Sequence, residues 1–221
     1  MAGSDPAPKS RTSVYERVKR AFDIVGACLG LVFLSPIIVG IALAIKSDSP
    51  GAVFYCGKRV GKYGRQFEIY KFRTMRPDSE ELGTTTAKDD PRITRLGGKL
   101  RRYKLDELPQ LLNVLKGEMS FVGPRPEVKE HTDAYNKEEE GILDIAPGIT
   151  DFSSLQFYNL DELLGTANAH YMFVSELRDQ KNVLRLKYVR ERGLLTDTKI
   201  LMRTVRMFIA SLVRGLKDSG S

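Results

Sequence analysis

An uncharged apolar run near the N-terminus is the longest feature in the pattern of hydrophobic and polar positions. It covers residues 24–45, and thirteen of these 22 residues are Leu, Ile, Val or Phe. As an unbroken helix it would be about 33 Å long, close to the bilayer hydrocarbon thickness of about 30 Å. Because the run is too long for the apolar region of a signal peptide, the pattern predicts a membrane helix over residues 14–48.

Two features favour a re-entrant helix–break–helix, which enters and leaves the membrane on the same face. Ser35 and Pro36 lie at the centre of the run. Proline removes one amide donor and pushes against the carbonyl one turn earlier, near Val32, and the Ser35 hydroxyl can hydrogen-bond a freed carbonyl. Basic residues also flank both ends, whereas a spanning helix normally keeps only its cytoplasmic flank positive. A kinked spanning helix is the alternative that the sequence leaves open.

The rest of the chain predicts an α+β fold that is mainly helical. Two β-favouring runs at 53–56 and 66–72 flank a glycine- and lysine-rich connection, a pattern typical of a β-hairpin. A phosphate-binding loop is the weaker interpretation of this connection, since no helix follows it. The other expected elements are a polar loop at 77–95, a basic helical or extended piece at 99–103, and helices at 109–116, 161–182 and 196–217.

The C-terminal helix is amphipathic. At 100° per residue its apolar residues fall within an arc of about 100°, and its basic residues lie on the opposite side. Such a helix suits a membrane–water interface, although a surface helix packed on a protein core has the same pattern. The apolar residues of this arc are Leu201, Val205, Phe208, Ile209, Leu212 and Leu216.

Composition adds a preference for anionic partners and excludes two kinds of site. The chain has 35 Lys and Arg against 28 Asp and Glu, a net charge of +7, which favours phosphates of nucleotides, nucleic acids or anionic lipids. Its two cysteines, Cys28 and Cys56, form no CxxC pattern, so a disulfide framework and a cysteine zinc site are excluded. Residues 1–13 are polar and are predicted to be a disordered leader or an expression scar.

The candidate chemistry lies between residues 71 and 126. Asp106 and Glu107 are adjacent carboxylates at a helix start, because Pro109 is tolerated only in the first turn. Free amides there, and Arg101 just upstream, favour the charged form of both carboxylates. Helix capping is the structural alternative for this pair.

Basic residues near the acidic pair are suited to binding phosphate. Strand alternation places Lys71 and Arg73 on one face as a phosphate clamp. Arg125 lies between two prolines that restrict its backbone. An acidic pair facing cations supplies what phosphoryl transfer needs: an anionic nucleophile, positive charge for phosphate, and a carboxylate for Mg²⁺.

Four segments resemble a known family. The sequences KRAFDIVGACLGLVFLSPI, FEIYKFRTM, KLDELPQLLNVLKGEMSFVGPRPE and APGIT resemble the bacterial sugar transferases, the monotopic polyprenyl-phosphate phosphoglycosyl transferases. The resemblance runs from about Tyr15 to the C-terminus and corresponds to their minimal catalytic core.

The resemblance implies transfer of a phospho-sugar from a UDP-sugar to undecaprenyl phosphate, giving a polyprenyl diphosphosugar and UMP through a covalent aspartyl-phosphosugar. Asp106 matches the nucleophile, and Glu107 matches the adjacent acid associated with Mg²⁺. Further matches are the basic active-site positions Lys71, Arg101 and Arg125 and the membrane-helix break at Ser35 and Pro36.

The same resemblance implies an arrangement at the cytoplasmic face of the bacterial inner membrane. Residues 14–48 would form the re-entrant helix and residues 49–217 a cytoplasmic catalytic domain. The expected partners are the UDP-sugar, undecaprenyl phosphate and membrane lipids, with no nucleic acid. Residues 151–158 (DFSSLQFY) depart from many relatives, so the sugar contacts after Thr150 stay open, as do the sugar, the pathway and the oligomeric state.

Two other functional classes compete with this interpretation. A basic membrane-anchored lipid- or nucleic-acid-binding module without catalysis explains the net charge and the amphipathic helix, but leaves LDELPQ and GPRP unexplained. A structural membrane scaffold explains the apolar run only.

Overall fold

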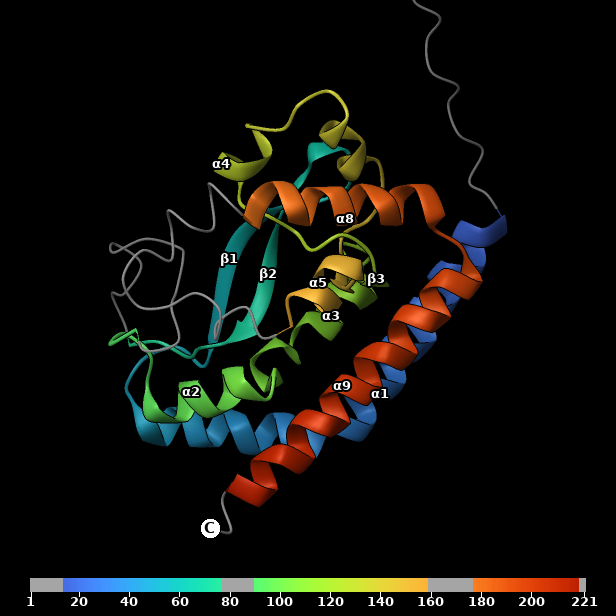
Figure 1. Cartoon of the computed structure of the whole chain (residues 1–221). Coiled ribbons are helices and arrows are strands. Elements are labelled where there is room, and N and C mark those ends of the chain that lie inside the picture. The colour runs from blue at the N-terminus through green and yellow to red at the C-terminus, as the bar shows by residue number, and fades with distance from the viewer. Residues whose placement is uncertain (1–13, 77–89, 159–176, 219–221) are drawn as a thin grey trace, which may run out of the picture.

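A long bent helix and a small β-hairpin organise the fold, which is seen in a computed structural model (Figure 1). The structure describes residues 14–76, 90–158 and 177–218. The predicted leader at 1–13 and most of the predicted helix at 161–182 lie outside these residues. The elements, with η for 3₁₀ helices, are α1 (Val14–Asp48), β1 (Phe54–Val60), η1 (Lys62–Gly64), β2 (Gln66–Phe72), α2 (Arg95–Arg102), η3 (Leu105–Glu107), α3 (Gln110–Lys116), β3 (Ser120–Val122), α4 (Lys129–Thr132), η4 (Glu139–Asp144), β4 (Gly148–Thr150), α5 (Phe152–Gln156), α8 (Arg178–Glu191) and α9 (Leu194–Asp218).

Helix α1 is 35 residues long and contains Pro36. Figure 1 shows it as two straight arms joined by a bend. Ser35 Oγ donates to the carbonyl of Val32 at 2.7 Å, the contact that the sequence predicts where proline frees a carbonyl. By length and composition alone α1 could cross a membrane: its most apolar stretch has a mean hydropathy of 2.6 and is only 6% buried. The protein itself therefore leaves most of this apolar surface uncovered.

The first arm of α1 is tied to the rest of the protein by polar contacts. The Arg20 guanidinium donates to the carbonyls of Val114 and Leu115 at 2.6 and 2.7 Å, which satisfies two acceptors at the C-terminal end of α3. Asp23 is 3% exposed, and its carboxylate accepts from the Phe121 amide at 3.0 Å. These contacts fix the direction of α1 relative to α3 and β3.

Strands β1 and β2 form the predicted antiparallel hairpin, with Cys56 opposite Tyr70. β1 continues to Val60, four residues beyond the run expected from the sequence. The reason is that Val60 is buried and its amide donates to the Glu127 carbonyl at 2.9 Å, so tertiary contacts extend the strand. The turn is confined to residues 61–65, where Tyr63 has a φ of 58°.

The free edge of β2 is covered by one side chain of α3. Asn113 Oδ1 accepts from the Tyr70 amide at 3.0 Å, and Asn113 Nδ2 donates to the Glu68 carbonyl at 2.7 Å. The side-chain amide thus pairs with β2 as a residue of a neighbouring strand would, which protects an edge that would otherwise be unpaired.

Strand β2 also lies against both arms of α1. Ile69 packs in one buried cluster with Ala27 of the first arm, and Phe72 packs in another with Ile45 of the second arm. Leu100 of α2 completes the latter cluster. The bent helix and the hairpin therefore share their core, and α2 packs on the second arm.

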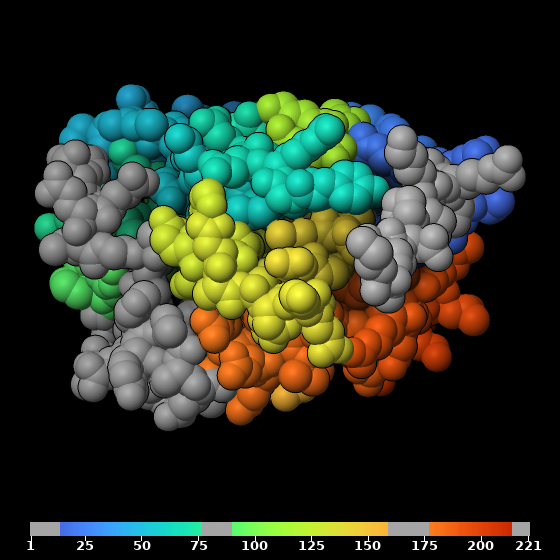
Figure 2. Space-filling model, turned by 90° about the horizontal axis from the view of Figure 1, so that it is seen from above, coloured from blue at the N-terminus to red at the C-terminus, as the bar shows by residue number. Residues whose placement is uncertain are grey.

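A third cluster joins the short parallel pair β3–β4 to the C-terminal helices. Ser120 lies opposite Gly148 in this pair, and Val122 packs with Tyr188 of α8 and Ile200 of α9. Figure 2 shows the hairpin between α1 and the segment that carries α4, with α8 toward the opposite edge.

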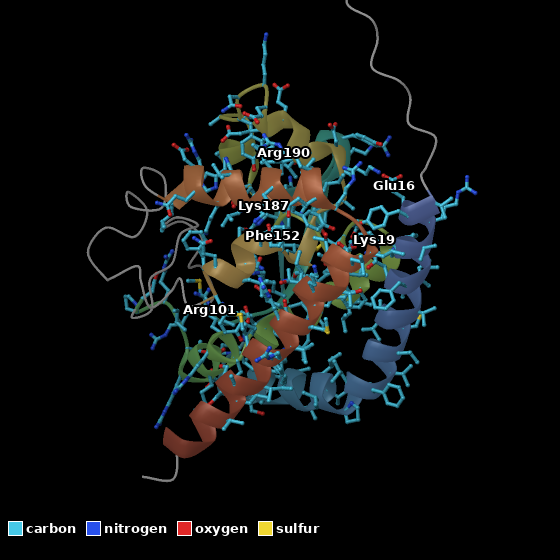
Figure 3. All side chains as sticks on the ribbon, turned by 45° about the vertical axis from the view of Figure 1, so that its right-hand side comes forward. Glu16, Lys19, Arg101, Phe152, Lys187 and Arg190 are labelled. Carbon is cyan, nitrogen blue, oxygen red and sulfur yellow. The ribbon has the colours of Figure 1, made fainter. Side chains whose placement is uncertain are left out.

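The N-terminal ends of α1 and α9 meet at a buried carboxylate. Asp197 accepts from Tyr15 at 2.9 Å, Lys19 at 2.7 Å and Tyr188 at 2.8 Å. Figure 3, in which Lys19 is labelled, shows α9 diverging from α1 beyond this junction. Exposed apolar side chains of α9 include Leu194, Leu195, Met202, Val205, Ile209 and Val213.

Several sequence predictions of helices are confirmed, with shifted ends. α3 ends at Lys116, and Gly117 has a φ of 86°, the left-handed cap that glycine favours. The predicted C-terminal helix is α9. The end of the predicted helix at 161–182 falls in α8, which continues to Glu191 because Tyr188 is buried in the core. The basic piece at 99–103 forms the end of α2, which runs from Arg95 to Arg102 with Tyr103 as its C-cap.

Candidate functional site

Two of the predicted cations meet at Glu107. Lys71 Nζ donates to Glu107 Oε1 at 3.1 Å. Arg125 Nη1 donates to Oε2 at 3.2 Å, and Nη2 donates to Oε1. Lys71 and Arg125 lie 36 and 18 positions from Glu107 along the chain, so the fold brings the three together. Both oxygens of Glu107 are engaged by cations, in a bidentate pair with Arg125.

Separate elements hold these three side chains. Lys71 extends from β2, and Glu107 ends η3, the 3₁₀ turn that leads into α3. Arg125 follows β3 in a segment fixed by β4, since the Gly148 amide donates to the Pro124 carbonyl at 3.0 Å. The approach is close: a Cβ on Gly148 would meet the backbone of this segment at 2.1 Å. Glycine is therefore required there.

The electrostatic surroundings strongly favour the ionised form of Glu107. Burial alone would raise the pKa of Glu107, but the charges of Arg125 and then Lys71 outweigh burial and hold that pKa well below its usual range. The pKa of Lys71 is lowered by burial, with the charge of Glu107 opposing the shift. Lys71 and Arg125 carry two positive charges and Glu107 one negative charge, so the three side chains have a net charge of +1.

Asp106 is in the opposite situation. Its side chain is buried, at 7% exposure, and its Oδ1 atom has no hydrogen-bond partner among the described residues. Burial and then the charge of Glu107 raise the pKa of Asp106, against the lowering influence of Lys71 and Arg101. The cations therefore favour the charged form most strongly at Glu107, whereas at Asp106 burial and the charge of Glu107 oppose the influence of the cations.

Arg101 and Arg73 take different places. Arg101 Nε donates to Thr74 Oγ1 at 2.9 Å, and its charge acts on Asp106; Figure 3 labels it on α2. Arg73 lies just beyond β2 and donates to the Ser49 and Pro50 carbonyls at 2.8 and 2.7 Å. The Arg73 side chain is thus engaged by the loop after α1, whereas Lys71 is engaged by Glu107, although the Arg73 amide still donates to the Val53 carbonyl at 2.9 Å.

The acidic pair is also the candidate site for Mg²⁺. In the described part of the chain, no group of three or more His, Cys, Asp or Glu side chains is arranged to hold a metal ion. The pair offers two hard carboxylates, of which the unpartnered oxygen belongs to Asp106. Because Mg²⁺ commonly takes only one or two protein carboxylates and completes its shell with phosphate and water, these residues fit the ion when a phosphate ligand is present.

A second buried polar cluster, which the sequence analysis missed, lies beside Arg125. Glu127 accepts from Arg185 Nη2 and is 3.1 Å from His131 Nδ1. Burial lowers the pKa of Lys181 to about 8, with the charge of Glu127 opposing the shift and those of Arg185 and Arg125 adding to it. The signal available in the sequence was Glu127 at the end of GPRPE, two positions after Arg125.

Comparison with known proteins gives consistent matches over most of the chain. A family model described as bacterial sugar transferase matches residues 14–211. UDP-N-acetylgalactosamine-undecaprenyl-phosphate N-acetylgalactosaminephosphotransferase of Aeromonas hydrophila is 34% identical over 202 residues, covering 89% of this chain and 44% of that protein. UDP-glucose:undecaprenyl-phosphate glucose-1-phosphate transferase of Escherichia coli K12 is 37% identical over 200 residues, covering 88% and 40%.

A shorter relative matches more closely over part of the chain. Putative undecaprenyl-phosphate N-acetylgalactosaminyl 1-phosphate transferase of Bacillus subtilis is 45% identical over 133 residues, covering 60% of this chain and 74% of that protein. The chain spans less than half the length of the Aeromonas and Escherichia relatives.

Proposed function

Because the chain belongs to the bacterial sugar transferase family, we propose that it transfers a phospho-sugar from a UDP-sugar to undecaprenyl phosphate. The products would be a polyprenyl diphosphosugar and UMP. The activities for which the relatives are named support the acceptor and the general reaction.

The observation that carries the proposal is the contrast between the two adjacent carboxylates. Glu107 is bonded to Lys71 and Arg125, whereas Asp106 is buried with one oxygen unpartnered among the described residues. A carboxylate oxygen that is out of water and has no donor to release before it attacks is a stronger nucleophile than a solvated one.

The proposed reaction has two displacements at one phosphorus. A carboxylate oxygen of Asp106 bonds to the β-phosphorus of the UDP-sugar, and the bond from that phosphorus to the bridging oxygen breaks. UMP leaves with the electron pair. A phosphate oxygen of undecaprenyl phosphate then attacks the same phosphorus, and the bond to Asp106 breaks, which regenerates the carboxylate. Splitting the exchange in this way replaces one difficult step with two easier ones.

The neighbouring cations stabilise charge on the phosphoryl oxygens during both displacements. Lys71 and Arg125 together carry more positive charge than Glu107 neutralises, and Arg101 acts on Asp106 from α2. Positive groups held in a fixed position need no reorganisation when phosphate charge shifts in the transition state.

Mg²⁺ is the proposed cofactor. Glu107 would hold it beside Asp106 once a bond to Lys71 or Arg125 is released, with phosphate oxygens and water completing its shell. When bound, the ion would neutralise charge on the diphosphate and on the departing UMP.

The membrane arrangement is also a proposal. The apolar part of α1 is almost uncovered, and α9 exposes apolar side chains, which supports contact of both with lipid. We place α1 as a re-entrant helix at the cytoplasmic face of the inner membrane, so that a lipid phosphate and a soluble nucleotide sugar both reach Asp106.

Release of UMP tests the function directly. Purified protein in detergent or nanodiscs is incubated with undecaprenyl phosphate, Mg²⁺ and each member of a panel of UDP-sugars. We expect UMP with at least one sugar: at most about one equivalent per enzyme without the lipid phosphate, and continued release when the lipid phosphate is in excess. No UMP with any UDP-sugar would contradict the proposal and favour a non-catalytic membrane module.

A further inference from the structure

Gln110 is a fully buried amide without partners. Its side chain is 0% exposed, and neither its nitrogen nor its oxygen has a hydrogen-bond partner among the described residues. Buried side-chain amides in folded proteins are nearly always hydrogen-bonded, because desolvating them without compensation destabilises the fold. A group that stays unsatisfied in the protein alone points to a partner that the chain does not contain.

The position of Gln110 places it beside the acidic pair. The backbone keeps right-handed helical dihedrals through Leu108 and Pro109, so η3 and α3 form nearly continuous helical structure. Gln110 lies four residues after Asp106, about one helical turn later along the chain. Helical side chains lean toward the N-terminus, which directs the Gln110 amide back toward the turn that holds Asp106.

Asn113, further along the same helix, provides a contrast. Asn113 is also 0% exposed, but its amide oxygen accepts from Tyr70 and its nitrogen donates to Glu68 and Glu118. Two buried amides three residues apart on one helix thus differ completely in hydrogen bonding. The hydrogen bonds of Asn113 hold α3 on β2. Gln110, which is nearer the carboxylates in sequence, makes no such bonds to the described residues.

Three buried polar atoms that have no hydrogen-bond partner in the described part of the chain therefore belong to residues only four positions apart: Asp106 Oδ1 and both polar atoms of Gln110. An amide N–H₂ and a carboxylate would bond to each other if they touched. Since they do not, the arrangement suits a ligand that bonds to both, with acceptor oxygens for Gln110 and an electrophilic centre for Asp106. A phosphoryl group has this chemistry.

We propose that Gln110 is a substrate-binding residue, whose amide nitrogen donates to an oxygen of the phosphoryl group that Asp106 attacks. Its carbonyl oxygen accepts from a hydroxyl group of the same ligand or from a water molecule bound to that ligand. The inference rests on the proposed function and deepens it, because it assigns the β-phosphoryl group of the donor nucleotide to a residue on α3.

The test compares Gln110→Met with the matched variant Asn113→Met, using UDP as the probe because it carries the β-phosphoryl group. Met is close to Gln in volume and has no polar group to leave unsatisfied. We expect Gln110→Met to keep or raise the thermal midpoint of the ligand-free protein and to weaken UDP affinity about tenfold by calorimetry, the effect of losing one good hydrogen bond. Asn113→Met should lower the thermal midpoint by several degrees, since it removes the bonds to β2.

The variant Gln110→Glu tests whether the hydrogen-bond donor of the Gln110 amide matters, or only the shape of the side chain. Glutamate keeps the length and volume of glutamine but brings a second negative charge toward the phosphoryl group and Asp106. We expect UDP binding to weaken more than in Gln110→Met. Wild-type UDP affinity in Gln110→Glu would overturn the assignment of a donor.

Other outcomes distinguish a failure of the Gln110 assignment from a failure of the proposed phospho-sugar transfer. If Gln110→Met lowers the thermal midpoint as Asn113→Met does and leaves UDP affinity unchanged, Gln110 holds a structural water and the inference is wrong. If the wild type releases UMP and Gln110→Met matches its kcat and KM, the inference fails while the function stands. If the wild type releases no UMP with any UDP-sugar, the function itself fails.

Discussion

Asp106 and Glu107 are consecutive residues whose carboxyl groups have opposite surroundings. Glu107 accepts hydrogen bonds from Lys71 and Arg125, and its pKa is well below its usual range. Asp106 Oδ1 has no partner among the described residues, and burial raises the pKa of Asp106. The pair is therefore divided into a carboxylate that holds cations and one that is available for reaction.

This division predicts which residue forms the covalent intermediate. With UDP-sugar and Mg²⁺ but no lipid acceptor, the intact mass of the wild type should rise by one phospho-sugar, located on the peptide containing Asp106. Asp106→Asn should form no adduct, with turnover reduced by about 10³-fold or more, and it should remain folded, because it removes a buried charge. The adduct should disappear when undecaprenyl phosphate is added.

The reverse result has a clear form. An adduct that persists in Asp106→Asn and vanishes in Glu107→Gln would assign the nucleophile to Glu107. Turnover without an adduct under any condition would indicate direct transfer between two bound substrates.

The second prediction concerns Mg²⁺. Glu107→Gln keeps the shape of the side chain but loses the charge that a hard dication requires, so both the rate and the dependence of UMP release on Mg²⁺ should fall. Glu130→Gln, on the exposed surface of α4, is the control and should titrate as the wild type does. Full activity in EDTA, or an unchanged Mg²⁺ titration in Glu107→Gln, would rule out this role.

The elements that the sequence predicted correctly depend on local signals. The hairpin follows from alternation and glycines, the end of α3 from Gly117, and the Ser35–Val32 contact from the position of Pro36. Each of these involves residues a few positions apart or one turn between two strands, so neighbouring residues determine them.

The site was predicted as a set of residues but not as an arrangement. Alternation along the strand indicates a shared face for Lys71 and Arg73, but Lys71 bonds to Glu107 whereas Arg73 bonds to the loop after α1. The difference between Asp106 and Glu107 depends on Arg125, which reaches the pair through β3–β4 packing. Such long-range contacts leave no periodic signal in the sequence.

The third prediction concerns the path of α1. In a Cys28→Ser, Cys56→Ser background, cysteines placed at Ser13 or Lys46 should both resist an impermeant maleimide in intact cells and both react after lysis. Labelling of one position from the periplasm would contradict the re-entrant arrangement. Pro36→Ala restores an amide donor and removes a steric clash, so it should straighten α1 and shift the segment toward spanning; unchanged labelling would mean that other contacts hold the bend.

The fourth prediction uses Lys181, whose pKa of about 8 is set by burial among Glu127, Arg185, Arg125 and Asp151. The unfolded chain keeps the ordinary lysine value of about 10.4. Between these two pH values the unfolded state binds more protons, so stability should rise with pH. Lys181→Met should remove this rise, a change on the order of 2–3 kcal/mol between pH 8 and 10.5.

Denaturant unfolding at several pH values measures the effect. Lys187→Met, at an exposed position of the same helix, serves as the control and should keep the wild-type slope. A Lys181→Met protein with the wild-type slope would show that another group is responsible.

The fifth prediction concerns the packing of α2 below the site. A Cβ on Gly97 would lie 2.0 Å from the Thr74 carbonyl oxygen, whereas on Gly98 the nearest atom would be 3.9 Å away. Gly97→Ala should destabilise the fold by about 2–3 kcal/mol and slow turnover, because Thr74 positions Arg101. Gly98→Ala should be neutral or stabilise α2 by up to about 1 kcal/mol. Equal thermal midpoints of the two variants would show that the helix moves away without loss.

The pairing of Asn113 with β2 restricts where the chain tolerates insertions. A helix packed on a strand by apolar contacts alone can slide, but hydrogen bonds to Tyr70 and Glu68 set the register of α3 against β2. Counting from that fixed point, Lys71 is the next residue along the strand, and Glu107 lies six residues earlier in the other segment. One residue inserted between Glu107 and Asn113 would rotate the acidic pair by about 100° about the helix axis. The number of residues between Asn113 and the acidic pair therefore cannot change without moving the carboxylates away from Lys71.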